Sequence, residues 1–267
     1  MGLDLYAGTL TRYYTRNWKT AVQQWSEQNN VRCEIITPDG ELGNENIDAE
    51  EVQSSTELWM EALISGLSNE DIFLKPWEEN NEKEYYTDKP DWAGYGALVI
   101  LSACLYSGKE VPKLYEKFSD WNDNLIVQDL VKEESYINSF LNGIEMWVPF
   151  EECMSFSYIF PTGKEANMST VGQLESDLQY INKMRWNADE ETILSWFDIE
   201  MVSDESNEDV FDFDALSRFA YCIFYKAVLF AKENKVPIIQ YDSLIYLLTI
   251  IRLKKVTRIL EIGTAIA

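Results

Sequence analysis

Residues 3–10, Leu3-Asp4-Leu5-Tyr6-Ala7-Gly8-Thr9-Leu10, open the chain with a stretch rich in residues that favour β-strands. Residues 18–28 follow, and their apolar side chains recur three and four positions apart, at Trp18, Ala21, Val22 and Trp25. This spacing places them on one face of a helix. A strand followed by a helix indicates a fold that mixes both kinds of element.

The rest of the chain continues in the same way. Apolar spacing predicts helices at residues 48–67, 92–106, 125–134, 171–187, 189–197 and 215–234. Further strands are predicted at residues 31–37, 146–150 and 154–160, the last two as a pair, and residues 236–239 read as a short extended segment. In the helix at 92–106, Gly94 and Gly96 would let another backbone approach closely. We therefore predict an α+β fold, with mixed helices, a small sheet and a helix–strand appendage at the C-terminal end.

Composition indicates a globular protein with an unusually acidic surface. The chain has 267 residues, 46% of them hydrophobic, which is ample for a buried core. Its 46 acids and 22 bases give a formal net charge of -24. Such a surface repels nucleic-acid phosphates and anionic lipids and favours basic partners. We expect a basic protein partner, no nucleic acid and no membrane, since the apolar stretches are too short or too interrupted to cross a bilayer.

The charge is unevenly distributed along the chain. Residues 226–267 carry a net charge of +4, so that residues 1–225 carry -28. A change of sign at one point indicates two segments, and we expect an acidic α+β domain at 1–235 and an appendage at 236–267. A single domain with a basic last helix is the alternative.

Two residue types limit the chemistry. The chain has no histidine, which excludes Ser-His-Asp and Cys-His mechanisms and the usual zinc sites. Its four cysteines are widely spaced in apolar or strand-like stretches, at Cys33, Cys104, Cys153 and Cys222. This pattern predicts buried free thiols in a reducing compartment. The first residues lack the basic start and long apolar run of a signal peptide, so we expect a cytoplasmic protein.

Residues 198–214 hold eight acidic residues and raise the question of a metal site. The ligand spacing, central glycine and terminal glutamate of a calcium loop are absent, and we predict no metal site here. Paired carboxylates for glycoside hydrolysis could occur in almost any fold with 46 acids, so their presence indicates nothing until distances are known.

Residues 77–91 combine acidic and aromatic side chains with little apolar periodicity, which predicts a loop. Aromatic rings with acidic neighbours suit a cationic protein surface. The candidate partner-binding residues are Trp77, Glu78, Glu79, Tyr85, Tyr86, Asp88 and Trp92. In the alternative interpretation these rings belong to the core or fasten the loop to it.

The last residues form a different kind of motif. Residues 257–264 (TRILEIGT) read as a continuous apolar strand with an acid and a glycine at its carboxyl end, after a predicted helix at 243–253. In a doubly wound sheet a cofactor meets a glycine-rich turn at this point. Residues 230–267 resemble the start of bacterial S-adenosylmethionine-dependent O-methyltransferases of the caffeoyl-CoA type. The resemblance implies S-adenosylmethionine as cofactor, lined by Glu261 and Gly263 of the first motif.

The sequence departs from that family in two ways. Ala267 stands where the family usually has a second glycine, and the part that would hold the ribose-binding acid, the metal ligands and the acceptor pocket is missing. We therefore expect no methylation by this chain alone. Residues 1–240, through residues 1–10 and 85–92, resemble an uncharacterised family of bacterial proteins, which implies no activity.

Two function classes follow. The first is an acidic cytoplasmic bacterial binding protein that needs no cofactor, for example one that neutralises a basic toxin. The alternative is an S-adenosylmethionine-dependent O-methyltransferase, or an incomplete piece of one.

Overall fold

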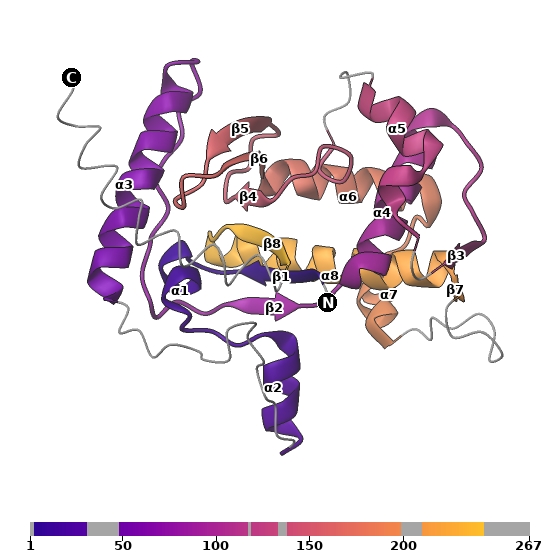
Figure 1. Cartoon of the computed structure of the whole chain (residues 1–267), viewed down its shortest axis with the longest axis horizontal. Coiled ribbons are helices and arrows are strands. Elements are labelled where there is room, and N and C mark those ends of the chain that lie inside the picture. Colours follow the sequence, from indigo (N-terminus) through magenta and orange to yellow (C-terminus); the bar gives the residue numbers. More distant parts are fainter. Residues whose placement is uncertain (1–2, 31–47, 117–118, 133–137, 199–209, 243–267) are drawn as a thin grey trace.

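The computed structural model of the chain describes residues 3–30, 48–116, 119–132, 138–198 and 210–242. Within these residues, eight α-helices surround a six-stranded mixed sheet, and two short strands form a second sheet (Figure 1). The predicted α+β class is confirmed.

The main sheet has the strand order β2-β1-β8-β4-β6-β5. Its strands, in this order, are Tyr86–Asp88, Leu3–Ala7, Ile238–Asp242, Met146–Val148, Glu165–Thr170 and Ser155–Ile159. Neighbours are antiparallel except β4 and β6, which run parallel. The second sheet pairs β3 (Leu114–Glu116) with β7 (Val210–Asp212). Since β1 and β8 lie side by side, the first and last described strands meet inside one sheet.

Helices cover both faces of the main sheet. On one face lie α4 (Asp91–Ser107), α6 (Val171–Arg185) and α8 (Phe213–Asn234). On the other lie α1 (Leu10–Thr15) and α3 (Ala49–Ser68). Helix α5 (Leu125–Lys132) packs on α4, α7 (Glu190–Ser195) packs on α8, and α2 (Ala21–Gln28) projects from the body (Figure 1). Short 3-10 helices lie at Trp121–Asp123 and Trp196–Asp198.

Strand β1 separates two hydrophobic cores. Because successive side chains of a strand point to opposite faces, Leu3, Leu5 and Ala7 enter the core under α4 and α8, while Tyr6 enters the core under α1 and α3. All five residues of β1 are buried. Strand β1, at the start of the sequence, therefore contributes side chains to both hydrophobic cores.

Helix α4 is buried over most of its length and packs against α8. Its residues from Gly94 to Cys104 are all buried, which explains its apolar character on every side. A Cβ atom added at Gly94 would lie 3.0 Å from the Cβ of Ala220 on α8. The predicted close approach is confirmed for Gly94, whereas a Cβ added at Gly96 would meet the side chains of Tyr115 and Trp121 rather than another backbone.

Several predictions are corrected by the structure. Strands β4 and β5 do not pair with each other, because β6, which the sequence analysis missed, lies between them. Residues 86–88 of the predicted loop form β2, paired with β1. The apolar face predicted for α2 is largely open to solvent, with Val22 49% and Trp25 57% exposed. Cys104 and Cys222 are buried as predicted, whereas Cys153 is exposed.

The predicted division at residue 236 stays a prediction. Residues 238–242 form β8 and pair with β1 and β4, so they belong to the main sheet. The predicted strand at 31–37, Cys33, and the predicted helix and strand of residues 243–267 lie outside the described residues.

The α4–α8 contact yields a first prediction. We expect Gly94→Val to lower the free energy of unfolding by about 1–3 kcal/mol, because the new side chain would clash with Ala220 in a packed core. The matched control is Gly66→Ala in α3, whose added Cβ would have only Tyr158 nearby, at 4.0 Å. The free energy of unfolding of this variant should rise by about 0.5–1 kcal/mol, because alanine has a higher helix propensity than glycine. Urea denaturation measures both, and a Gly94→Val protein as stable as wild type would contradict the close packing.

Candidate functional site

Two of the predicted partner-binding residues, Trp77 and Glu79, are buried in the core under α1. Glu79 is 3% and Trp77 7% exposed. The Glu79 carboxylate accepts hydrogen bonds from the backbone N–H groups of Leu10 and Thr11, at 3.1 and 2.8 Å, and from the indole of Trp77 at 2.7 Å. Burial raises the pKa of the Glu79 carboxyl, and these hydrogen bonds oppose the rise. Glu79 thus satisfies two of the free N–H groups at the start of α1.

Tyr85 and Tyr86 lie on opposite faces of the sheet. Tyr85 packs against the core under α1 and α3, and Tyr86 against the core under α8, as strand alternation requires. The Tyr86 hydroxyl donates to Asp88 at 2.9 Å, and the ammonium group of Lys226 on α8 lies 3.6 Å from the same carboxylate. Burial raises the pKa of Tyr86 well above its ordinary value. Tyr86 and Asp88 are therefore engaged with α8.

Only Glu78 and Trp92 of the predicted set are exposed. Trp92 is 37% exposed and meets Tyr95 edge to face, and Glu78 lies 3.9 Å from Lys83. The predicted set is thus divided between the core, the two faces of the sheet and the surface. Sequence alone could not separate them, because burial depends on contacts with distant helices.

Tyr85 lines a pocket that the sequence analysis did not predict. The pocket has a volume of about 520 Å³ and lies where the end of α1 meets α2. Its lining includes Arg12, Arg16, Trp18, Lys19, Glu27 and Tyr85. Three bases and one acid stand together here, in a chain where acids outnumber bases 46 to 22. The crowding of Arg12, Arg16 and Lys19 into eight residues is a signal that the sequence contained.

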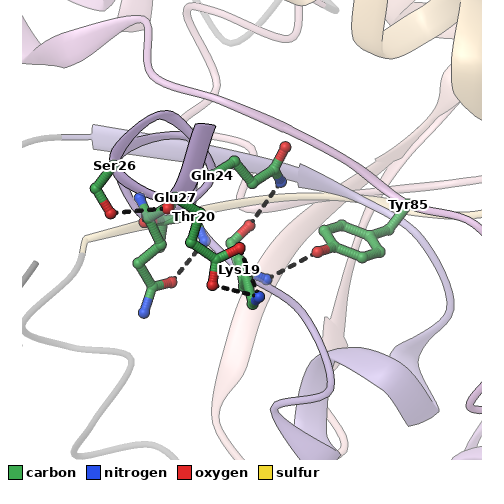
Figure 2. A network of polar contacts seen from close by, with 7 residues as sticks. Lys19, Thr20, Gln24, Ser26, Glu27 and Tyr85 are labelled. Carbon is green, nitrogen blue, oxygen red and sulfur yellow. Dashed lines mark hydrogen bonds and ion pairs between the residues drawn. The ribbon is translucent and has the colours of Figure 1, made fainter. Parts of the chain in front are cut away.

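The backbone of Lys19 is clamped to the segment around β2 (Figure 2). Its N–H donates to the Tyr85 hydroxyl at 3.0 Å, and its carbonyl accepts from the Gln24 amide at 2.9 Å and the Thr87 hydroxyl at 3.1 Å. The Lys19 ammonium group meets the Glu27 carboxylate at 2.5 Å. At the next residue Thr20 and Gln23 form a reciprocal capping box that starts α2. The side of the pocket made by α2 is therefore held by hydrogen bonds to β2.

Arg12 also lines the pocket. Its Nε donates to the carbonyl of Asn17 and its Nη1 to the carbonyl of Lys83, and its guanidinium lies 4.5 Å from the centre of the Tyr85 ring. Two carbonyls and an aromatic face fix the plane of the guanidinium. The pocket is thus preformed by contacts between α1, the 77–85 segment and α2.

A second surface feature is the outward face of α3, which we call the α3 face: Glu51, Ser54, Leu58, Glu61, Ala62 and Ser65. These positions are three or four residues apart and all exposed, Leu58 to 65%. The opposite face of the helix buries Thr56, Met60 and Leu63. Glu57 lies beside this face, half-buried, and accepts a hydrogen bond from Gln53.

Glu261 and Gly263, named for the methyltransferase alternative, lie outside the described residues. Within the described part of the chain, no group of three or more metal-ligating side chains could hold an ion, and no helix has the length and apolar character to cross a bilayer.

Comparison with known proteins adds no assignment, since no family model, curated protein or solved structure matches this chain. The two resemblances described for residues 1–240 and 230–267 stay predictions.

The Glu79 carboxylate yields a second prediction. We expect Glu79→Gln to lower the free energy of unfolding by about 1–3 kcal/mol, because in either orientation its amide nitrogen would face a backbone N–H donor, that of Leu10 or that of Thr11. The neighbouring Glu78→Gln change removes the same charge at an exposed position and should alter stability by less than about 0.5 kcal/mol. Chemical denaturation of both variants measures the difference. Equal effects would show that Glu79 does not anchor α1.

A third prediction concerns Asp177, a buried acid on α6. Burial raises the pKa of Asp177 to about 6, although it accepts hydrogen bonds from the Ser139 N–H at 2.7 Å and the Gln173 amide at 2.9 Å. The folded state therefore favours the protonated form. The resulting stabilisation is complete below the unfolded pKa of about 4 and falls as the pH rises to about 6.

Asp177→Asn should remove this pH dependence, because an asparagine can accept from Ser139 and donate to a reoriented Gln173 amide. The free energy of unfolding of wild type relative to the variant should fall by about 1–3 kcal/mol between pH 4 and pH 6. Urea denaturation at several pH values tests this. A difference that stays constant over that range would contradict the raised pKa.

Proposed function

We propose that this protein acts by binding a basic protein partner through the α3 face, without a cofactor or a reaction of its own. A protein that neutralises a basic toxin is one example of this class. The observation that carries the proposal is the joint exposure of acidic and apolar side chains on a helix face whose opposite side is anchored in the core.

In the sequence, the charges on and next to the α3 segment are all of one sign. Between Arg32 and Lys75 the sequence contains eleven acids and no lysine or arginine. Asp48, Glu50 and Glu51 lie at the start of α3, where carboxylates stabilise the helix N-terminus, so their presence has a structural reason. Glu57 and Glu61 lie in the middle of the helix, where the dipole does not explain them. These two acids are the ones we assign to a partner.

The pattern on the α3 face suits a protein interface. Leu58 and Ala62 give an apolar centre that water would leave on binding, and acids beside it give polar contacts at the rim. The net charge of -24 also raises the rate at which the protein meets a positively charged partner, and it disfavours acidic competitors.

The methyltransferase alternative stays a prediction. It depends on Glu261 and Gly263, which are outside the described residues, and no described contact favours it.

A fourth prediction tests the proposal by charge reversal on α3. The full chain, immobilised, should enrich a basic protein from bacterial lysate at about 0.15 M salt. After identification and purification, that protein should bind the free chain with defined stoichiometry in titration calorimetry. Glu57→Lys with Glu61→Lys should weaken the affinity at least about tenfold, because two attractive charges become repulsive.

The matched control is Glu151→Lys with Glu152→Lys, which changes the net charge by the same amount at exposed residues next to β4. It should alter the affinity less than about twofold. Equal losses in both variants would mean that net charge rather than the α3 face drives binding. Failure to enrich any basic protein would overturn the proposal itself.

A further inference from the structure

We propose that the pocket between α1, α2 and Tyr85 binds a phosphorylated small molecule. This inference is independent of the α3 face: it concerns a cationic pocket on a protein whose surface is otherwise strongly acidic. Three observations support it: Arg16 has no side-chain partner among the described residues, the guanidinium of Arg12 is held in place by its contacts, and Lys19 is already paired with the carboxylate of Glu27.

Arg16 is the central observation. It ends α1 in the left-handed backbone conformation, with φ 59°, a position at which glycine is preferred. Its guanidinium makes no hydrogen bond or ion pair with any described residue, and its Nε is shielded from solvent. A shielded N–H donor without an acceptor costs free energy, and such groups in folded proteins call for a specific explanation. Arg16 also lines the pocket, where an anion can supply an acceptor for the terminal nitrogens of its guanidinium.

Arg12 is held ready for the same anion. The carbonyls of Asn17 and Lys83 occupy its Nε and Nη1, and the Tyr85 ring fixes its plane, so that Nη2 is left without a partner among the described residues. An arginine whose rotamer is already fixed loses little entropy when it binds an oxyanion. The pocket is thus lined by two arginines: Arg16, whose guanidinium has no partner among the described residues, and Arg12, whose guanidinium is held in place.

Lys19 and Glu27 show that the pocket already holds a carboxylate. Their ion pair is exposed on both sides, at 50% and 59% of the side chains, and exposed pairs of this kind are weak. An incoming anion can therefore replace Glu27 as the partner of Lys19. With three bases and one acid the lining carries a net charge of +2, which matches a phosphate dianion better than a single carboxylate.

The size of the pocket favours a phosphorylated small molecule over inorganic phosphate as its ligand. A volume of about 520 Å³ falls within the range of small-molecule sites and far exceeds one phosphate group. The indole of Trp18 and the ring of Tyr85 give apolar wall for the rest of the ligand. The overall charge of -24 does not cancel the local field, because charges beyond about 8 Å are screened at physiological salt.

The test is a nuclear magnetic resonance titration of the full chain at pH 7, following the arginine Nε–H and Lys19 amide signals. The probes are inorganic phosphate, ribose 5-phosphate and, as uncharged reference, ribose. Ribose 5-phosphate should shift the Arg16 and Lys19 signals and bind more tightly than inorganic phosphate, whereas ribose should not. No shift with either phosphate probe up to about 20 mM would overturn the proposal, as would equal shifts with citrate.

Variants of neighbouring residues should change the affinity in opposite directions. Arg16→Gly should weaken ribose 5-phosphate binding about tenfold or more, yet unfold at the same or a higher temperature, because glycine relieves the left-handed backbone. Glu27→Gln should tighten binding about threefold by releasing Lys19. Lys164→Gln, which removes a charge paired with Glu145 in another part of the fold, should change it less than about twofold. Equal losses in Arg16→Gly and Lys164→Gln, or no gain in Glu27→Gln, would contradict the site.

Discussion

The hydrogen-bonded ladder between β1 and β8 is the interaction on which the rest of the structure depends. It joins Leu3 to Asp242 and Ala7 to Ile238, so the two ends of the described chain meet in the middle of one sheet. The alternating side chains of β1 enter the core under α8 on one face and the core under α1 on the other. Neither core can be complete until both strands are in place, since each contributes to both faces.

From that ladder the chain passes directly into the pocket. Strand β1 ends at Ala7, α1 starts at Leu10, and the Glu79 carboxylate fixes the start of the helix from a segment about seventy residues away. The same segment continues to Tyr85 and β2, which hold Arg12 and the backbone of Lys19. The pocket is thus built from segments that the β1–β2 pairing and the hydrogen bonds of Glu79 and Arg12 bring together. By fixing the start of α1, the buried Glu79 carboxylate helps to position the helix that carries Arg12 into the neighbouring cationic pocket.

Two oppositely charged features therefore lie on the same face of the sheet as α1 and α3. Glu61 lies on the exposed face of α3 with half-buried Glu57 beside it, and Arg12, Arg16 and Lys19 line a pocket. An acidic helix face and a cationic pocket can function on the same protein. Short-range hydrogen bonds determine which ligand the two arginines bind, whereas the long-range electrostatic field of the whole protein determines which macromolecules approach it. The proposed protein partner and the proposed phosphorylated ligand would use different chemistry and would not require the same residues.

Local sequence determined the longer helices, the close approach at Gly94, the absence of histidine chemistry and the acidic surface, because these depend on spacing and composition within a few residues. It did not indicate the short helix α1, whose first residue falls within the opening strand-like stretch. Only the tertiary structure decided that β6 separates β4 from β5, that Tyr85 and Tyr86 face opposite cores and that Cys153 is exposed. It also turned Glu79 from an expected surface residue into a buried acceptor for the first N–H groups of α1, and it assembled the pocket around Arg16. The physical reason is that strand order, burial and hydrogen-bond partners are set by contacts between residues far apart in the chain, and a periodic pattern carries no information about which distant segment will supply them.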